Sequence, residues 1–349
     1  MGADLTLRDI PDVTIFIPTH ERPGYLARIL AYWSHHGMAG RVVVCDSSRE
    51  SFARVGDFGA VRYFPFPGVP FAEKVARCLG EVDTPLVVFN ADDDFLAPRA
   101  VAECARFLRE HPDHSSAQGK QAVFTVEGES LRFRPVYLSQ CRMNVDSDDP
   151  GERLAQALSP YMNQFYAVHG TETFRDYFQQ AAESGIQSGS LLEILLSLFS
   201  AVAGKHGILD VFYYTREQVK DSGGRRSKRL DAVLASPELQ GECRAFFRAA
   251  EEALSARTGM GRAEAGAAVN RAVDGYLKNL PPPPGALARL RARVRESLPE
   301  GVVRAVRAAR GRAEANPGPD FDAWLAGFGP GAREDLEAME GHVRTFGPR

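Results

Sequence analysis

Strand-like and helix-like segments alternate along the first part of the chain, and this alternation constrains the fold more than any other feature. The strand-like runs are apolar and rich in β-branched residues, and they span Val13–Thr19, Arg41–Ser48 and Pro85–Asn90. Apolar residues recur at helical spacing in the segments 26–33, 71–79 and 99–109. Strands that alternate with helices predict an α/β fold, with a mostly parallel sheet covered by helices on both faces. A shorter, proline-broken run around Tyr63 is expected at the sheet edge.

Polar residues follow each of the three strand-like runs. Thr19 to Arg22 follow the first run, Asp46 to Ser48 end the second, and Asp92, Asp93 and Asp94 follow the third. In parallel sheets, ligands bind at the carboxyl ends of the strands. We therefore expect these polar residues to meet at one edge of the sheet and to form a binding site.

Asp92, Asp93 and Asp94, here called the acidic triplet, raise an electrostatic problem. Three adjacent carboxylates repel one another, so a fold that keeps them together is expected to place a cation nearby. Oxygen ligands of this kind suit Mg²⁺ or Mn²⁺, which leave coordination positions open for the oxygens of a diphosphate. The alternative is an acidic turn in which Asp94 caps the next helix.

Four segments together resemble the nucleotide-sugar-binding half of a GT-A glycosyltransferase. They read VTIFIPTHERPGYLARIL, VVVCDSS, FAEKVARCLG and VVFNADDDFLAP, in that order. The chain is most similar to the family 2 group, whose members mostly transfer a sugar with inversion. The resemblance covers 13–109 well and extends more loosely to about residue 222. It implies a Rossmann-like GT-A fold that binds a nucleotide-sugar donor.

The resemblance also implies roles for particular residues. The end of the first strand would frame the nucleobase and ribose, through Pro18, Thr19, Glu21 and Arg22. Asp46 would recognise the base, and Lys74 would approach the nucleotide. Ribose and Mn²⁺ or Mg²⁺ would be bound by Asp92, Asp93 and Asp94. Many members read Asp-x-Asp-Asp, whereas this chain has Ala91 at the first acid. The resemblance therefore does not decide which aspartate holds the metal and which holds the ribose. Asp92 is the first candidate for the ribose.

Each of these assignments has a purely structural alternative. Glu21 and Arg22 could form a surface ion pair, which would contribute under about 1 kcal/mol to stability. Asp46 could close a turn through its side chain, as aspartates before serines do. Lys74 could be a solvated helix residue.

A transferase also needs a base that removes a proton from the acceptor hydroxyl. In the family this acid lies downstream of the metal motif at a helix start, and Glu193, in SGSLLEILLSLF, matches that place. The alternative is a capping box, in which Glu193 and Ser190 bond to each other's backbone N–H groups. Glu172 and Asp176 are further candidates for the base.

Some GT-A enzymes add a histidine to the metal site. His169 and His206 are the available candidates here, although a lone histidine near an apolar strand is more often a hydrogen-bonded core residue. The basic, glycine-broken segment 215–229 could close over a diphosphate and supply charge from Arg216 or Arg225. It could equally be a solvated loop.

We expect the GT-A domain to span 1–230, with a nucleotide-binding half at 13–112 and an acceptor half at 113–230. Alanine-rich helices follow at 231–280, and a run of prolines opens the region 281–349. Residues 286–312 carry eight arginines and two glutamates on amphipathic helices. This basic stretch could contact an anionic membrane surface, or it could pack on the catalytic domain or on a second subunit in a homo-oligomer.

The leading interpretation is a metal-dependent glycosyltransferase that uses a nucleotide-diphosphate sugar, expected to be UDP-linked, in glycan or surface polysaccharide synthesis. The acceptor is a glycan, a lipid-linked molecule or a protein. Two alternatives are a non-catalytic nucleotide-sugar-binding protein and a sugar nucleotidyltransferase. Against the second, this chain lacks the glycine-rich basic loop that nucleotidyltransferases carry after the first strand. The net charge of −3 does not favour nucleic acid as a partner. Five cysteines without a CxxC pair, and no visible secretion signal, indicate a cytoplasmic protein, peripheral to the inner membrane face if 286–312 binds lipid.

Overall fold

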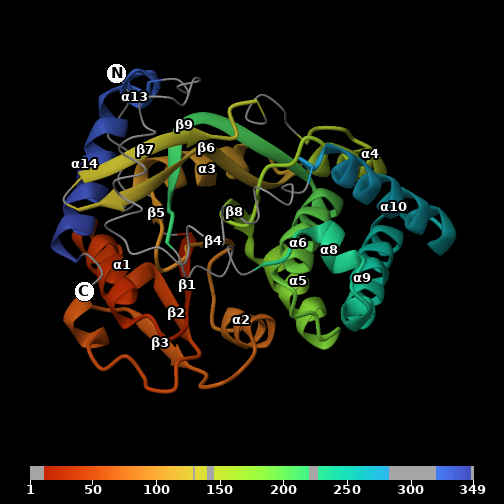
Figure 1. Cartoon of the computed structure of the whole chain (residues 1–349), viewed down its shortest axis with the longest axis horizontal. Helices are drawn as coiled ribbons and strands as arrows, with labels where there is room; N and C mark the ends of the chain where they lie inside the picture. The colour runs from red at the N-terminus through yellow and green to blue at the C-terminus, as the bar shows by residue number, and fades with distance from the viewer. Residues whose placement is uncertain (1–11, 129, 140–144, 220–226, 283–319, 347–349) are drawn as a thin grey trace.

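A nine-stranded sheet runs through the part of the chain that the computed structural model describes (Figure 1). That part comprises 12–128, 130–139, 145–219, 227–282 and 320–346. Arg225 and the basic stretch 286–312 lie outside it. The order of the main strands is β3-β2-β1-β4-β8-β6-β9-β5, and β7 pairs with β6.

The first half of the sheet is parallel, as the alternating pattern predicts. Its strands are β1 (Val13–Thr19), β2 (Val42–Asp46), β3 (Arg62–Pro65) and β4 (Leu86–Phe89). The helices between and after them are α1 (Pro23–His35), α2 (Phe71–Leu79) and α3 (Pro98–Glu110). β1 pairs in parallel with both β2 and β4, and β3 is the edge strand. The sequence-based boundaries are confirmed to within a few residues.

The second half of the sheet is mixed. Its strands are β5 (Phe95–Leu96), β6 (His114–Glu127), β7 (Ser130–Val136), β8 (Val168–Gly170) and β9 (Lys205–Glu217). β8 is antiparallel to both β4 and β6, whereas β9 is parallel to β6. Short β5 follows the acidic triplet directly and pairs with the end of β9, with Phe95 opposite Thr215. This pairing brings the carboxyl end of β9 to the triplet.

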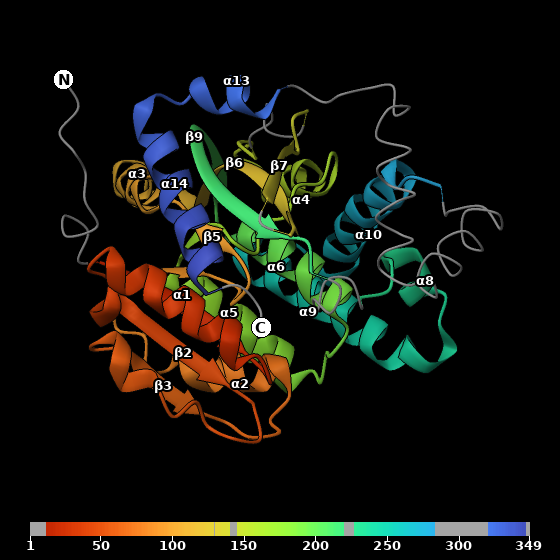
Figure 2. The same cartoon turned by 60° about the vertical axis from the view of Figure 1, so that its left-hand side comes forward.

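Helices cover both faces of the sheet. One face packs against α2, α5 (Thr171–Glu183) and α6 (Gly189–Ala203). On that same side, a further layer of helices packs on α6 and on one another, made of α4 (Pro150–Leu158), α8 (Leu230–Leu234), α9 (Gln240–Thr258) and α10 (Arg262–Asn279). The other packs against α1, α3, α13 (Phe321–Ala326) and α14 (Pro330–Thr345). Short 3₁₀ turns occur at Ala39–Arg41, Val55–Phe58 and Pro237–Leu239. Figure 2 shows α14 lying along α1, with α5, α6 and α9 on the opposite side of the sheet. No helix among the described residues is both long and apolar enough to cross a bilayer.

Gly119 lies where β6 and β9 shift register and approach each other closely. A Cβ atom built on it would lie 2.5 Å from the Val211 carbonyl oxygen and 2.7 Å from Tyr213 Cβ. Both neighbours belong to the backbone or are attached to it directly, so they cannot rotate away. The close pairing of β6 and β9 therefore requires glycine at this position.

We expect Gly119→Ala to lower the free energy of unfolding by about 1–3 kcal/mol, the usual cost of overpacking a core. Urea denaturation measures the change. Gly241→Ala, on α9 with no heavy atom within 4 Å of the added methyl group, is the matched control and should be neutral or slightly stabilising. Equal effects of the two substitutions would contradict the expectation.

Candidate active site

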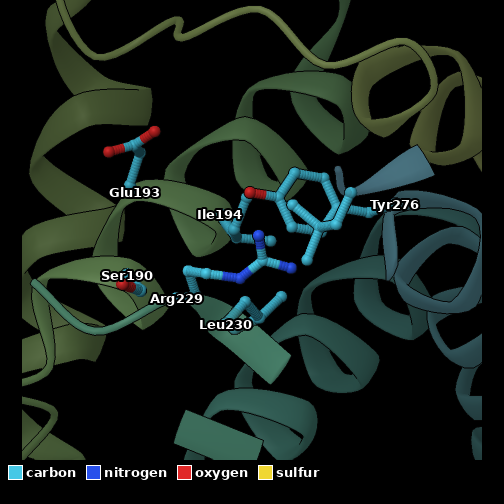
Figure 3. Close-up of a pocket in the computed structure, with 7 residues that line it drawn as sticks. Ser190, Glu193, Ile194, Arg229, Leu230 and Tyr276 are labelled. Atoms are coloured by element: carbon cyan, nitrogen blue, oxygen red, sulfur yellow. The ribbon is translucent and has the colours of Figure 1, made fainter. Parts of the chain in front are cut away.

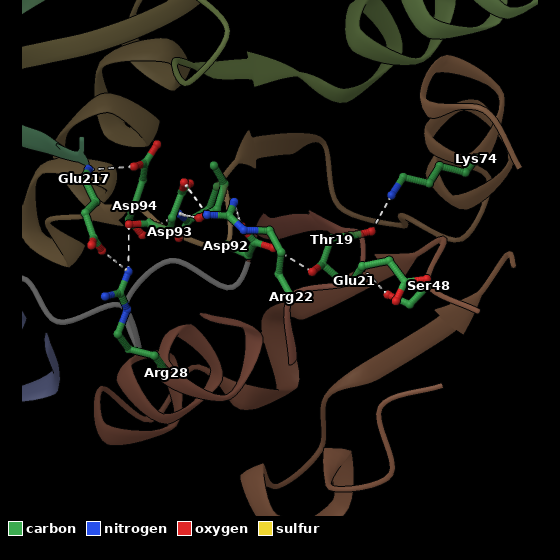
Figure 4. Close-up of polar contacts among 12 residues, drawn as sticks. Thr19, Glu21, Arg22, Arg28, Ser48, Lys74, Asp92, Asp93, Asp94 and Glu217 are labelled. Carbon is green, nitrogen blue, oxygen red and sulfur yellow. Dashed lines mark hydrogen bonds and ion pairs between the residues drawn. The ribbon is translucent and has the colours of Figure 1, made fainter. Parts of the chain in front are cut away.

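The polar ends of β1, β2 and β4 meet at one edge of the sheet, as the parallel order requires (Figure 4). Thr19 lies opposite Asp46 in the β1–β2 register, and Pro18 precedes it, opposite Cys45. Lys74 reaches this edge from α2. Its Nζ donates to the Thr19 carbonyl at 2.5 Å and to Ser47 Oγ at 2.9 Å. Lys74 is buried, so the solvated-helix alternative is wrong.

Asp92 and Asp93 accept hydrogen bonds from the first strand end. Thr19 Oγ1 donates to Asp92 Oδ2 at 2.6 Å, and Arg22 Nη1 donates to Asp92 Oδ1 at 2.7 Å. The second amino group of Arg22 donates to Asp93 Oδ2 at 2.8 Å. The Arg22 guanidinium therefore bridges two neighbouring carboxylates. The alternative of a Glu21–Arg22 surface pair is wrong, because Glu21 pairs with Arg49 instead.

Asp94 is held by the end of β9. Its two carboxylate oxygens accept hydrogen bonds from the Tyr214 hydroxyl and, at 2.9 Å, from the backbone N–H of Glu217. Helix α3 begins only at Pro98, and its N-cap residue, Ala97, has no side-chain hydrogen bond. The alternative in which Asp94 caps the next helix is therefore wrong.

A second arginine, Arg28, contacts the backbone of the triplet. Arg28 is fully buried on α1, and its Nη2 lies 2.9 Å from the Asp93 carbonyl oxygen and 2.7 Å from Glu217 Oε2. The Tyr25 ring lies near both guanidinium groups, at 4.2 Å from Arg22 and 4.9 Å from Arg28. These cation–π contacts add to the ion pairs. The cation expected beside the acidic triplet is thus arginine in this structure.

Burial and charge shift the pKa values at this edge in opposite directions. Burial raises the pKa of Asp92 to about 7, although Arg22 opposes the shift, and burial also raises the pKa of Asp94 well above its usual range. Burial alone would lower the pKa of Arg22, but Asp92 and Asp93 outweigh it and raise that pKa further. Arg22 therefore stays charged and favours ionised carboxylates around it.

The donor atoms around the triplet do not form a dication site as they stand. Five of the six carboxylate oxygens accept bonds from Arg22, Thr19, Tyr214 or the Glu217 backbone. Within the described residues, no three His, Cys, Asp or Glu side chains come together as a metal cluster. A divalent cation at Asp92 and Asp93 would have to displace the Arg22 guanidinium, so metal binding remains a prediction from the sequence.

Asp46 closes a turn and also meets a residue that the sequence did not single out. Its Oδ1 accepts the Ser48 N–H at 2.8 Å, which is the turn geometry of the structural alternative. Its Oδ2 accepts the Tyr63 hydroxyl at 2.6 Å. Next to it, Glu21 has a φ of 53°, in the left-handed region that non-glycine residues rarely adopt, and its N–H bonds to Ser48 Oγ. Such backbone strain is found most often at functional sites.

Glu193 lies at the start of the second turn of α6, beside a pocket (Figure 3). The pocket has a volume of about 80 Å³ and is lined by Ser190, Glu193, Ile194, Arg229, Leu230, Tyr276 and Leu280. The Tyr161 hydroxyl donates to Glu193 Oε1 at 2.7 Å, while Ser190 Oγ donates to the Lys228 carbonyl. Ser188 is the N-cap residue of α6, and its side chain forms no capping bond. The capping-box alternative for Glu193 is therefore wrong.

Arg216 relates Glu193 to the acidic triplet electrostatically. It is an exposed residue near the end of β9, and its charge lowers the pKa of both Asp94 and Glu193. Burial nevertheless keeps the pKa of Glu193 above the usual value of a glutamate. One solvent-facing guanidinium thus acts on the carboxylates at both places.

The remaining candidate residues lie apart from this arrangement. His169 Nε2 is hydrogen-bonded to the Gln164 carbonyl oxygen at 2.8 Å, and His206 Nδ1 is hydrogen-bonded to Ser116 Oγ at 2.8 Å. Both histidines are buried, on β8 and β9. Burial lowers the pKa of His169 to about 4 and that of His206 to about 3. Both are therefore core histidines in this structure. Glu172 and Asp176 are exposed on α5.

We expect Arg28→Met to lower the free energy of unfolding by about 3–5 kcal/mol, because it leaves Glu217 buried without its cation. Thermal and urea unfolding measure the loss, and Arg28→Met with Glu217→Gln should recover part of it. Arg333→Met, which breaks the exposed pair with Asp322, is the control and should change stability by less than about 1 kcal/mol. A loss no larger than the control's would contradict the structural importance of Arg28.

Comparison with known proteins supports the fold. No protein-family model and no curated protein matches the sequence. The solved structure of S. aureus TarS 1-349 in complex with UDP-GlcNAc aligns with a TM-score of 0.51 at 14% identity, over 96% of this chain and 90% of that chain. A second solved structure of S. aureus TarS 1-349 aligns with a TM-score of 0.50 at 12% identity, over the same shares of the two chains. Glucosyl-3-phosphoglycerate synthase from Mycobacterium tuberculosis, in complex with Mn²⁺, UDP-glucose and phosphoglyceric acid, reaches 0.39 at 14% identity, over 75% and 86% of the two chains. That last likeness is too low to say anything of this chain's ligands. The fold of this chain is α/β and GT-A-like.

Proposed function

We propose that this chain is a glycosyltransferase that moves a sugar from a nucleoside diphosphate, UDP in the first place, to an acceptor hydroxyl. The observation that carries the proposal is the edge of the sheet where the polar ends of β1, β2 and β4 meet at the buried acidic triplet. Glu193 lies beside a pocket elsewhere on the chain, and the charge of Arg216 lowers the pKa of both Asp94 and Glu193. A donor at the triplet would place its diphosphate near a cation, and we propose that Glu193 serves its sugar as the base.

The donor would bind at the edge formed by β1, β2 and β4. Asp46, Tyr63 and the backbone around Thr19 offer hydrogen-bonding groups for the base and ribose. Lys74 and Arg216 supply positive charge near the diphosphate. TarS shares this fold and is crystallised with UDP-GlcNAc, which makes UDP sugars the first donors to test.

The acceptor would approach through the pocket beside Glu193. The Tyr161 and Tyr276 rings meet edge to face at 5.2 Å, and Leu230 adds an apolar wall near Glu193. Glu193 would take the proton of the acceptor hydroxyl as its oxygen bonds to the anomeric carbon. The bond from that carbon to the diphosphate breaks in the same step, and the nucleoside diphosphate leaves. Such a single displacement inverts the anomeric centre. Since Tyr276 comes from α10, we propose that the helices at 231–280 contribute to the acceptor side.

Metal dependence is the sequence's prediction, with Mn²⁺ or Mg²⁺ as the ion. The contacts of Arg22 do not support it as they stand, so the cations assigned here are Arg216 and Lys74. Donor-binding measurements made with added Mn²⁺ and with EDTA test the metal separately from the transfer reaction.

The runner-up is a nucleotide-sugar-binding protein without transfer activity. In that reading Glu193 would have only a structural role, but the capping box that would give it one is absent. Its hydrogen bond to Tyr161 is the remaining structural contact that favours the runner-up.

A panel of UDP, GDP, CMP and dTDP sugars should raise the melting temperature for one nucleotide class, with UDP expected. Asp92→Asn combined with Asp94→Asn should abolish the shift, because both carboxylates are needed to shape the donor edge. Glu193→Gln should keep the shift but lose at least about a hundredfold in donor hydrolysis or transfer, the typical contribution of a general base. Unchanged turnover in Glu193→Gln would leave the binding protein as the better reading.

The activity of the wild type should fall as pH drops through the raised pKa of Glu193, since only the ionised carboxylate accepts a proton. The Tyr161 hydroxyl lowers that pKa, so Tyr161→Phe should raise it and move the ascending limb of the pH–rate profile to higher pH. Tyr177→Phe removes a hydroxyl that donates to the Leu192 carbonyl, and it should leave the limb in place. A limb that moves to lower pH in Tyr161→Phe would count against Glu193 as the base.

A further inference from the structure

The side chain of Arg22 occupies the place beside the acidic triplet where a divalent cation would bind. Its two amino groups donate to Asp92 Oδ1 at 2.7 Å and to Asp93 Oδ2 at 2.8 Å. A planar guanidinium suits this bridging geometry, because its two N–H groups point in parallel at two acceptors. The side chains of Asp92 and Asp93 are only 4% and 7% exposed, so water screens the contacts weakly.

Several contacts hold Arg22 in this position. Its guanidinium lies 4.2 Å from the centre of the Tyr25 ring. Its backbone is fixed at the start of α1, where the Leu26 N–H bonds to the Arg22 carbonyl at 3.0 Å. The preceding residue, Glu21, is anchored to Ser48 and Arg49. The side chain itself remains 22% exposed, so solvent reaches it.

We propose that Arg22 is a resident counter-cation that competes with a divalent cation for Asp92 and Asp93. A dication gains these two oxygens only when the guanidinium leaves them. If Arg22 covers them for about nine-tenths of the time, the apparent dissociation constant of the metal rises about tenfold above its intrinsic value. Metal binding without donor is therefore weak in the wild type.

A diphosphate changes this competition, a step that rests on the proposed donor site. Its oxygens offer Arg22 a second set of anionic acceptors that suit its paired N–H groups. When Arg22 turns to the diphosphate, Asp92 and Asp93 become free. UDP should then tighten the binding of Mn²⁺, and by linkage Mn²⁺ should tighten the binding of UDP by the same factor.

The test is a titration of Mn²⁺ alone, followed by the electron paramagnetic resonance signal of the free ion, at the same pH for the wild type and every variant. Arg22→Gln should bind Mn²⁺ about tenfold more tightly than the wild type. Arg22→Lys keeps the charge but cannot bridge both carboxylates, so it should show a smaller gain. Asp92→Asn, added to Arg22→Gln, should remove the gain and so locate it at the triplet.

Arg54→Gln is the matched control, since it removes the same charge from an exposed pair with Asp57 and should leave Mn²⁺ binding unchanged. Circular dichroism confirms that each variant is folded, and Arg22→Lys carries the test if Arg22→Gln is not. Equal or weaker Mn²⁺ binding in the folded Arg22 variants overturns the proposal. Because this titration contains no nucleotide, its outcome is independent of the glycosyltransferase assignment. In a second titration, UDP should tighten Mn²⁺ binding in the wild type but not in Arg22→Gln, and an equal effect in both would overturn the link to the donor.

Discussion

The ion pairs of Arg22 with Asp92 and Asp93, and of Arg28 with Glu217, determine how the parts of this site fit together. Three neighbouring aspartates are buried at the end of β4, and an unpaired buried carboxylate costs several kcal/mol. Arg22 forms ion pairs with the carboxylates of Asp92 and Asp93. Arg28 donates to the Asp93 carbonyl oxygen and forms an ion pair with Glu217. The start of the chain, the triplet and the end of β9 are therefore joined in one network of charges.

The pairing of β5 with β9 extends this network toward Glu193. β5 is only two residues long, but it fixes Tyr214 and Glu217 against Asp94. Arg216 lies between them in the sequence and faces outward, where its charge acts on Asp94 and on Glu193. The mixed half of the sheet thus does more than close the core, because it carries Arg216, whose charge lowers the pKa of both carboxyl groups.

Local pattern predicted the parallel half of the sheet well, because apolar runs and helical spacing report burial directly. The same pattern identified the strand ends around Thr19, Asp46 and the triplet, which the structure brings together. It did not predict the contacts of Arg28, Tyr63 or Tyr214, since each partner lies far away in sequence. Residues 190–193 match a capping box with Ser190 as N-cap, yet the N-cap of α6 is Ser188, two residues earlier, and the side chains of Ser190 and Glu193 bond elsewhere. Tertiary packing decided these cases.

Helix α14 reaches the buried arginine through a series of aromatic rings. His342 meets Tyr32 edge to face at 5.4 Å, Tyr32 meets Phe95 at 5.0 Å, and Phe95 lies 5.1 Å from the Arg28 guanidinium. Removing α14 would expose these aromatic rings to water and weaken the packing of Phe95 against the Arg28 guanidinium. Residues more than two hundred positions downstream of the aspartates therefore help to hold the end of the sheet that carries the acidic triplet.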